Sequence, residues 1–157
     1  MGRRQPPVLI ERTLLLAQEE IDASAIEHIV ALQRGGYHLL LLAEQPHRWR
    51  PTRRSVDHDL ALQQELQQRI SRAGAELDGV VYLETGLFSR KRTRTHALDE
   101  LASRYKVPAA DLVFIGQDSI LLESVILSGG KSIAVASPGV KGSVPVNSLK
   151  AAIDRLG

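Results

Sequence analysis

The chain has 157 residues, of which 43% are hydrophobic and 24% are charged, with a formal net charge of +2 and no cysteine. This composition is typical of one globular domain and excludes a disordered chain, disulfides and thiolate metal sites. Because no apolar run approaches the roughly 18 residues of a membrane span, we also exclude a membrane protein. We therefore expect a single domain over residues 1–157, located in the cytoplasm.

Apolar runs alternate with amphipathic stretches along the chain. A strand is predicted over Val8–Leu16, followed by a helix over Ala25–Arg34 that Asp22 or Ser24 can cap and Gly35 can end. The same alternation predicts four more strands, over residues 37–43, 79–83, 112–116 and 132–136. It also predicts four more helices, over residues 57–73, 97–105 and 120–128 and from Asn147, as the cap, to about residue 156. Residues 137–146 have the glycine and proline content of a loop.

The β-α-β-α order indicates an α/β fold in which a parallel sheet is covered by helices on both faces. In such folds ligands bind beyond the carboxyl ends of the strands. The segments that follow those ends are residues 11–14, 44–54, 84–94 and 117–121. We therefore expect any functional site to be assembled from these four segments.

Basic residues gather in two of the same segments. One contains Arg48, Arg50, Arg53 and Arg54 beside Trp49, and the other contains Arg90, Lys91, Arg92 and Arg94. These eight are a large share of the twenty Lys and Arg residues in the chain. The pattern is consistent with an anion-binding edge, with nucleic-acid binding, or with solvated surface charge.

Two motifs resemble those of the haloacid dehalogenase (HAD) superfamily, near its sugar-bisphosphate and histidinol-phosphate phosphatase branch. The first is Val8-Leu9-Ile10-Glu11-Arg12-Thr13-Leu14, and the second runs from Val113 through Gly116-Gln117-Asp118 to Glu123. In that family the first strand ends in Asp-x-Asp-Gly, and the late strand ends in Gly-Asp with another Asp four residues on. The matching positions here are occupied by Glu11, Thr13, Leu14, Gln117 and Leu121. The resemblance implies a HAD-like Rossmannoid three-layer sandwich with a central parallel sheet and no large cap.

Other parts of the resemblance suggest ligand-binding residues. Ser89-Arg90-Lys91 is similar to the Cys-Arg-Lys segment of the heptose-bisphosphate phosphatases, which implies phosphate binding by Lys91 and substrate contact by Arg90. Gln45 matches the last residue of the family's Thr-Asn-Gln segment, and Arg50 stands where the family often has an arginine that reaches the substrate. The predicted ligand-binding residues are therefore Gln45, Arg50, Arg90 and Lys91.

The replaced motif residues bear directly on catalysis. In the family the first Asp attacks phosphorus and the second protonates the leaving oxygen. Glu11 is one methylene longer than Asp, and a misplacement of ~1 Å can cost ~10²-fold in rate. Thr13 cannot serve as a general acid, a loss of typically ~10² to 10⁴-fold. Gln117 and Leu121 also remove two acidic groups from the expected Mg²⁺ site.

We expect no metal and no cofactor at these positions. A shift of register by one residue could bring Asp118 and Glu11 together as Mg²⁺ ligands. The competing interpretation of Asp118 is that it caps the helix that follows. Mg²⁺ is expected only if the protein is an active phosphatase.

The sequence thus predicts a catalytically inactive HAD-like protein that binds an anionic small molecule or a protein partner. One alternative is a phosphatase for a small sugar phosphate with Glu11 as the nucleophile. A second alternative is a nucleic-acid-binding module built on the arginine-rich segments. That module is disfavoured by the modest net charge and by the small number of aromatic residues, with one Trp, two Phe and three Tyr.

Overall fold

The computed structural model describes residues 7–18, 20–45, 53–84 and 89–156, without the side chains of residues 44–45 and 53–56. In the described part, none of the helices combines the length and the apolar character that crossing a membrane requires. The larger strands are β1 (Pro7–Glu11), β4 (His38–Gln45), β5 (Gly79–Glu84), β6 (Val113–Gly116), β7 (Lys131–Val135) and β8 (Val144–Val146). The helices are α1 (Ala23–Arg34), α2 (Arg53–Arg72), α3 (Lys91–Arg104), α4 (Ser119–Leu127) and α5 (Leu149–Asp154). Short elements complete the fold: the 3₁₀ helices η1 (Arg12–Leu15) and η2 (Ala109–Asp111), and the antiparallel pair β2 (Leu16–Ala17) and β3 (Glu20–Ile21).

The six larger strands form one sheet in the order β5-β4-β1-β6-β7-β8, and every neighbouring pair is parallel. The predicted parallel sheet is therefore confirmed. β8 forms the last three residues of the segment 137–146 predicted to be a loop, so that prediction is wrong for residues 144–146 and right for residues 137–143. Pro145 in the middle of β8 is compatible with the strand because β8 is at the edge of the sheet, where one side of the backbone needs no partner.

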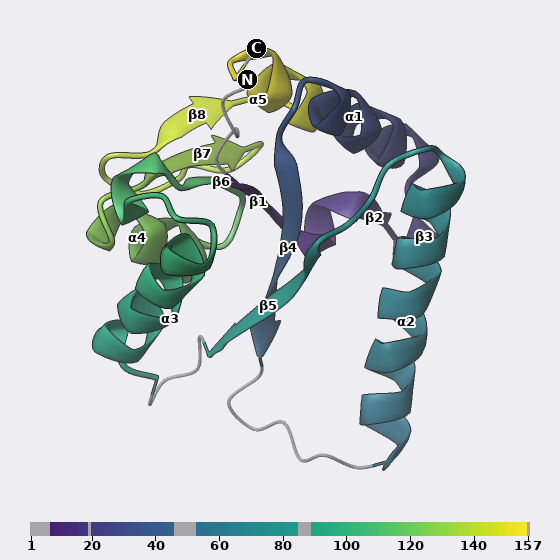
Figure 1. The fold of residues 1–157 in the computed structure, drawn as a ribbon, viewed down its shortest axis with the longest axis horizontal. Helices are drawn as coiled ribbons and strands as arrows, with labels where there is room; N and C mark the ends of the chain where they lie inside the picture. Colours follow the sequence, from purple (N-terminus) through teal and green to yellow (C-terminus); the bar gives the residue numbers. More distant parts are fainter. Residues whose placement is uncertain (1–6, 19, 46–52, 85–88, 157) are drawn as a thin grey trace.

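Helices cover both faces of the sheet (Figure 1). On one face, α1, α2 and α5 pack over strand residues that include Val8 and Ile10. On the other, α3 and α4 pack over Leu9 and its neighbours. Side chains alternate between the two faces of a strand, so an apolar run such as Val8-Leu9-Ile10 contributes to both cores. This is why the strands have continuous rather than alternating hydrophobicity.

Several predicted boundaries require correction. The strand predicted over Val8–Leu16 ends at Glu11, because the chain turns into η1 there. The helix predicted from Ala97 begins at Lys91, six residues earlier, because its first turn is basic and lacks the apolar periodicity used to find it. The last helix is capped by Ser148, whose hydroxyl accepts from the backbone of Ala151, and not by Asn147. The prediction of Asp22 as a cap for α1 is confirmed.

Candidate functional site

Glu11 lies at the carboxyl end of β1, beside the loop that joins β6 to α4. Its side chain is only 5% exposed. Oε1 accepts hydrogen bonds from the backbone N–H groups of Gln117 at 3.1 Å and Asp118 at 2.9 Å. Oε2 accepts a hydrogen bond from the hydroxyl of Thr13. The carboxylate is therefore held by three donors from two separate segments of the chain.

The loop after β6 is arranged around this carboxylate. Asp118 caps α4, because its Oδ1 accepts from the backbone N–H groups of Ile120 at 2.9 Å and Leu121 at 3.0 Å. This agrees with the interpretation of Asp118 as a helix cap. The side chain of Leu121 is buried, at the position where the family has its second late acidic residue.

Gln117 does not face Glu11 with its side chain. Its Nε2 donates to the carbonyl oxygen of Val135 at 3.0 Å, and its own carbonyl accepts from the hydroxyl of Ser137 at 3.3 Å. Gln117 thus joins the β6–α4 loop to the end of β7. Only its backbone N–H reaches the Glu11 carboxylate.

A cavity of about 250 Å³ opens beside Glu11. It is lined by Glu11, Arg12, Thr13, Leu42, Ala43, Asp118 and Leu121. Two carboxylates face it, and each has at least one oxygen engaged by backbone N–H groups. Across the described residues, no group of three or more His, Cys, Asp or Glu side chains is arranged to hold a metal ion.

An ion-pair network that the sequence did not reveal lies next to this cavity. The guanidinium of Arg12 contacts Asp59 Oδ1 at 2.5 Å, Tyr82 Oη at 3.2 Å and Gln63 Oε1 at 3.3 Å. The hydroxyl of Tyr82 donates to Asp59 Oδ2 at 2.6 Å. The network ties η1 to α2 and β5, so Arg12 does not form the local pair with Glu11 that adjacency in sequence suggests. The i, i+4 spacing of Asp59 and Gln63 was the available sequence signal, since it places both side chains on one helix face.

Asp59 should make the stability of the protein sensitive to acid. Burial alone raises the pKa of Asp59, but the hydrogen bonds from Arg12 and Tyr82 outweigh it and hold the pKa below its ordinary value of 3.8. A lowered pKa contributes stability that is complete above the unfolded-state value and is lost as the pH falls through the folded-state value. We expect Asp59→Asn to lower the free energy of unfolding at pH 7 by about 1–3 kcal/mol, since Arg12 loses its ionic partner in a half-buried position.

Urea unfolding at several pH values checks this prediction. The difference between the wild type and Asp59→Asn should persist down to about pH 4 and disappear below it, as the wild-type carboxylate takes up a proton. Asp99→Asn, on the exposed face of α3, is the matched control and should leave stability within about 0.5 kcal/mol. A difference that does not change with pH would show that the ionic form of Asp59 contributes nothing.

The second basic segment does not form one exposed patch. Arg90 is exposed and precedes α3 without capping it through its side chain. Lys91 is exposed and its Nζ pairs with Glu123 Oε1 at 2.9 Å. Arg94 is buried at 7% exposure, so the interpretation of the segment as solvated surface charge is wrong for this residue. The sequence could not reveal this, because the partner of Arg94 on α4, Ser124, is 30 residues away.

The first basic segment, with Arg48, Arg50, Arg53 and Arg54, falls largely outside the described part of the chain. The predicted ligand residue Arg50, together with Arg48 and Trp49, lies outside the described residues. Gln45 closes β4, but its side chain is outside the described part, as are the side chains of Arg53 and Arg54. The interpretation of this segment as an anion-binding surface therefore stays a prediction.

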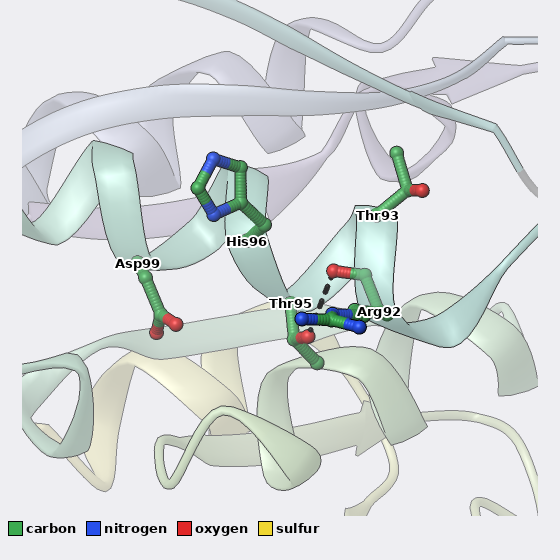
Figure 2. Close-up of a pocket in the computed structure, with 5 residues that line it drawn as sticks. All are labelled: Arg92, Thr93, Thr95, His96 and Asp99. Atoms are coloured by element: carbon green, nitrogen blue, oxygen red, sulfur yellow. Dashed lines mark hydrogen bonds between the residues drawn. The ribbon is translucent and has the colours of Figure 1, made fainter.

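A wider hollow of about 590 Å³ lies on α3 (Figure 2). Among the described residues, its lining comes from that one helix: Arg92, Thr93, Thr95, His96 and Asp99. The hydroxyl of Thr95 donates to the carbonyl oxygen of Arg92 at 3.1 Å, a contact within the helix, and His96 pairs with Glu100 one turn on. Because no second element in the described part of the chain supplies converging groups, we place the candidate site at the Glu11 cavity instead.

Comparisons with known proteins support the fold. No family model and no curated protein sequence matches the chain. Among solved structures, the D,D-heptose 1,7-bisphosphate phosphatase from B. bronchiseptica, complexed with magnesium and phosphate, is similar with a TM-score of 0.77 and 14% identity over 97% of both chains. The D,D-heptose 1,7-bisphosphate phosphatase from Burkholderia thailandensis is similar with a TM-score of 0.70 and 15% identity, also over 97% of both chains. A putative HAD-like phosphatase from Mesorhizobium loti gives a TM-score of 0.72 and 15% identity over all of this chain and 91% of the other.

These similarities extend over nearly the whole chain and show a HAD-like fold. The six-stranded parallel sheet with helices on both faces is the α/β Rossmannoid arrangement predicted from the sequence, with no large cap in the described part of the chain. At identities of 14–15%, the comparisons establish the fold and leave the chemistry to be argued from the residues of this chain.

Proposed function

We propose that this protein is a catalytically inactive HAD-like protein, a pseudophosphatase that binds an anionic or phosphorylated ligand or a macromolecular partner. The observation that carries the proposal is the state of Glu11. Both oxygens of its carboxylate accept hydrogen bonds, from two backbone N–H groups and from Thr13. A nucleophile must present an oxygen to phosphorus, whereas this one is buried and stabilised as an acceptor.

The surrounding residues support the same conclusion. Thr13 donates to Glu11 and cannot exchange a proton usefully near neutral pH. Gln117 directs its amide to β7 and away from the cavity. Mg²⁺ prefers octahedral oxygen ligation that includes carboxylates, but the donors that converge on Glu11 Oε1 are N–H groups. These residues do not fit a Mg²⁺ site, and we propose that the protein needs no cofactor.

Anion binding is the activity that remains available to this end of the sheet. Arg90 is exposed just before α3. Lys91, the next residue, forms a salt bridge with Glu123. Arginine and lysine can bind phosphate without a catalytic carboxylate. The predicted ligand residues Gln45, Arg50, Arg90 and Lys91 belong to this proposal, as does a cytoplasmic location for the cysteine-free chain. A competition experiment among phosphosugars, nucleotides and short nucleic acids, measured by fluorescence anisotropy, would show whether the protein binds small molecules or nucleic acids.

The alternative is a working phosphatase for a small sugar phosphate with Glu11 as the nucleophile. The similarity to a heptose-bisphosphate phosphatase complexed with magnesium and phosphate favours it at the level of the fold. We expect no hydrolysis of sugar bisphosphates, histidinol phosphate or p-nitrophenyl phosphate by the purified protein with Mg²⁺. Phosphate release should stay at the level of the blank, whereas active enzymes typically turn over at ~1 to 10³ s⁻¹. Turnover that disappears with Glu11→Gln would overturn the proposal.

A variant that restores the motif residues gives a second measurement. The quadruple change Glu11→Asp, Thr13→Asp, Leu14→Gly and Gln117→Asp returns the carboxylates that the family uses. We expect weak recovery at best, because other motif positions also differ: Ala43 and Glu44 stand where the family's Thr-Asn-Gln segment has Thr and Asn. Full recovery would show that these four positions alone account for the loss of chemistry.

Mg²⁺ should also leave the stability of the protein nearly unchanged. A ligand that binds only the folded state raises the thermal midpoint in a saturable manner. In a thermal-shift series up to millimolar Mg²⁺, we expect a flat response for the wild type and for Asp118→Asn alike. A saturable rise that Asp118→Asn abolishes would reveal the metal site of shifted register formed by Glu11 and Asp118.

A further inference from the structure

Arg94 is a buried cation with no carboxylate at hydrogen-bond or ion-pair distance among the described residues, although its charge is one of the lesser causes that lower the pKa of Glu123. Arg94 is 7% exposed, and its Nε donates to Ser124 Oγ at 2.8 Å. Its Nη1 donates to Ser89 Oγ at 2.5 Å and makes a longer contact of 3.4 Å with the carbonyl oxygen of Glu84. All three acceptors are neutral, and Nη2 donates to no described residue. A buried guanidinium is usually paired with a carboxylate, because removing its charge from water is costly.

The nearest acid on the neighbouring helix is already occupied. Glu123 of α4 pairs with Lys91 at 2.9 Å, and this contact is the main reason that the pKa of Glu123 is lowered. Glu123 is therefore engaged by Lys91 and forms no ion pair with Arg94.

A cavity of about 180 Å³ adjoins Arg94, between the end of β5 and the start of α3. We call it the Arg94 pocket. Its polar lining includes Ser89, Arg90, Thr93 and Arg94, with Glu84 at the end of β5. Two cations and two hydroxyl groups thus face one small space, against a single exposed carboxylate.

The start of α3 adds to the positive potential of this space. The side chain of Arg90, the N-cap residue, makes no capping hydrogen bond, and the first turn of the helix contains no acidic residue. The free N–H groups and the macrodipole of a helix favour negative charge at its N-terminus, where Lys91 and Arg92 instead add positive charge. An anion would satisfy both the helix and the buried Arg94. That combination distinguishes this helix start from an ordinary one.

We infer that the Arg94 pocket binds a tetrahedral oxyanion of the size of a phosphate group, held by Arg94 and Arg90 with the hydroxyl of Thr93. The inference rests on the proposed anion-binding function and places the anion at the start of α3, away from the Glu11 cavity. The volume limits what the pocket encloses to the oxyanion group itself. A larger organic part of a phosphate monoester would lie outside, towards solvent.

The test is an NMR titration of the full-length chain with inorganic phosphate, observed through backbone amides and the arginine Nε–Hε groups. Saturable shifts are expected at Ser89, Thr93 and Arg94, and the affinity should fall as salt is raised. Arg90→Gln should weaken binding by about tenfold, the loss expected for one charge-assisted hydrogen bond. Arg92→Gln removes an equal charge from the same helix outside the Arg94 pocket and should change affinity by less than about twofold. Glu84→Gln should strengthen binding.

Substituting Arg94 can destabilise the fold, because it removes contacts that join β5 to α4. Arg94→Lys is the informative change, since it retains the charge and loses the planar fork. If that variant unfolds, Arg90→Gln and Thr93→Val still test the pocket from exposed positions. A second titration with glycerol 3-phosphate in place of inorganic phosphate shows whether the pocket prefers a monoester to the free ion. Saturable shifts of the same resonances with either ligand support the pocket.

Two results would overturn the inference in different ways. Shifts confined to residues around Glu11 and Gln117, with no effect of Arg90→Gln, would place the anion in the Glu11 cavity. The Arg94 pocket would then be wrong, while the proposed anion-binding function would stand. No saturable shift at any residue up to tens of millimolar phosphate, an affinity too weak to be functional, would contradict both the Arg94 pocket and the proposed binding of a phosphorylated small molecule.

Discussion

Replacing Glu11 with alanine should lower the free energy of unfolding by about 3 kcal/mol. The change removes the acceptor of two backbone N–H groups, those of Gln117 and Asp118, at a side chain that is 5% exposed. A buried donor left without its acceptor costs roughly 1–3 kcal/mol. For a chain of this length, each kcal/mol corresponds to about 2–4 °C in the thermal midpoint, so the midpoint should fall by roughly 6–12 °C.

Conservative changes at Glu11 show which property of the side chain matters. Glu11→Gln retains a carbonyl oxygen for the two N–H groups and should cost less than the change to alanine. Glu11→Asp retains the charge, but it is one methylene shorter and should cost nearly as much as the change to alanine, because the carboxylate no longer reaches the β6–α4 loop. Glu27→Ala, on the exposed face of α1, is the control and should change stability by less than about 0.5 kcal/mol. Chemical denaturation of the four variants gives the order.

The opposite result would have a clear meaning. Functional groups in active sites are often held at a cost to stability, so removing a nucleophile commonly leaves stability unchanged or raises it. If Glu11→Ala is as stable as the wild type, Glu11 does not anchor the loop. The alternative of a phosphatase with Glu11 as its nucleophile would then be favoured.

The fold could be predicted because its signals are local and repeated. Apart from β8, the strands of the central sheet are short apolar runs, and the intervening helices have their own periodicity or caps, such as Asp22 before α1. Parallel order follows from the alternation of strands with helices. β8 was missed because it has three residues, one of them Pro145, and pairs along one side only. The start of α3 was missed because a basic first turn has no apolar pattern.

The candidate site could be predicted only in part. Topology was enough to bring Glu11 and Gln117 together, since β1 and β6 are neighbours in a parallel sheet. The direction of each side chain was not predictable, because it depends on distant partners. Gln117 turns to Val135, Arg12 to Asp59 and Arg94 to Ser124, over separations of 18 to 47 residues. Such contacts are decided by tertiary packing and leave no periodic trace in the sequence.

Gly116, the last residue of β6, lies where two buried groups approach the backbone closely. A Cβ atom at this position would lie 2.3 Å from Cζ and 2.6 Å from Cε2 of Phe114, and 2.9 Å from Oε1 of Glu11. Phe114 is fully buried in the core beneath α3 and α4, so its ring has no free space to enter. The absence of a side chain at Gly116 thus lets the aromatic core and the Glu11 carboxylate approach the same stretch of backbone.

Gly116→Ala should therefore destabilise the protein by about 2–3 kcal/mol, near the upper end of the range for overpacking a core. Gly35→Ala is the control, because Gly35 has an ordinary φ of −73° and the nearest contact of an added Cβ is 3.2 Å. It should cost less than about 1 kcal/mol, since the added methyl group fits with a small adjustment. Thermal and urea unfolding of both variants measure the difference.

A double-mutant cycle between Gly116→Ala and Glu11→Ala tests whether the two positions act together. If the added methyl group displaces the carboxylate from the N–H groups of Gln117 and Asp118, the two changes remove the same interaction. The double variant should then be more stable than the sum of the single costs predicts, by at least about 0.5 kcal/mol. Strict additivity would assign the whole cost of Gly116→Ala to Phe114. It would also separate the packing of the core from the binding of the Glu11 carboxylate by the β6–α4 loop.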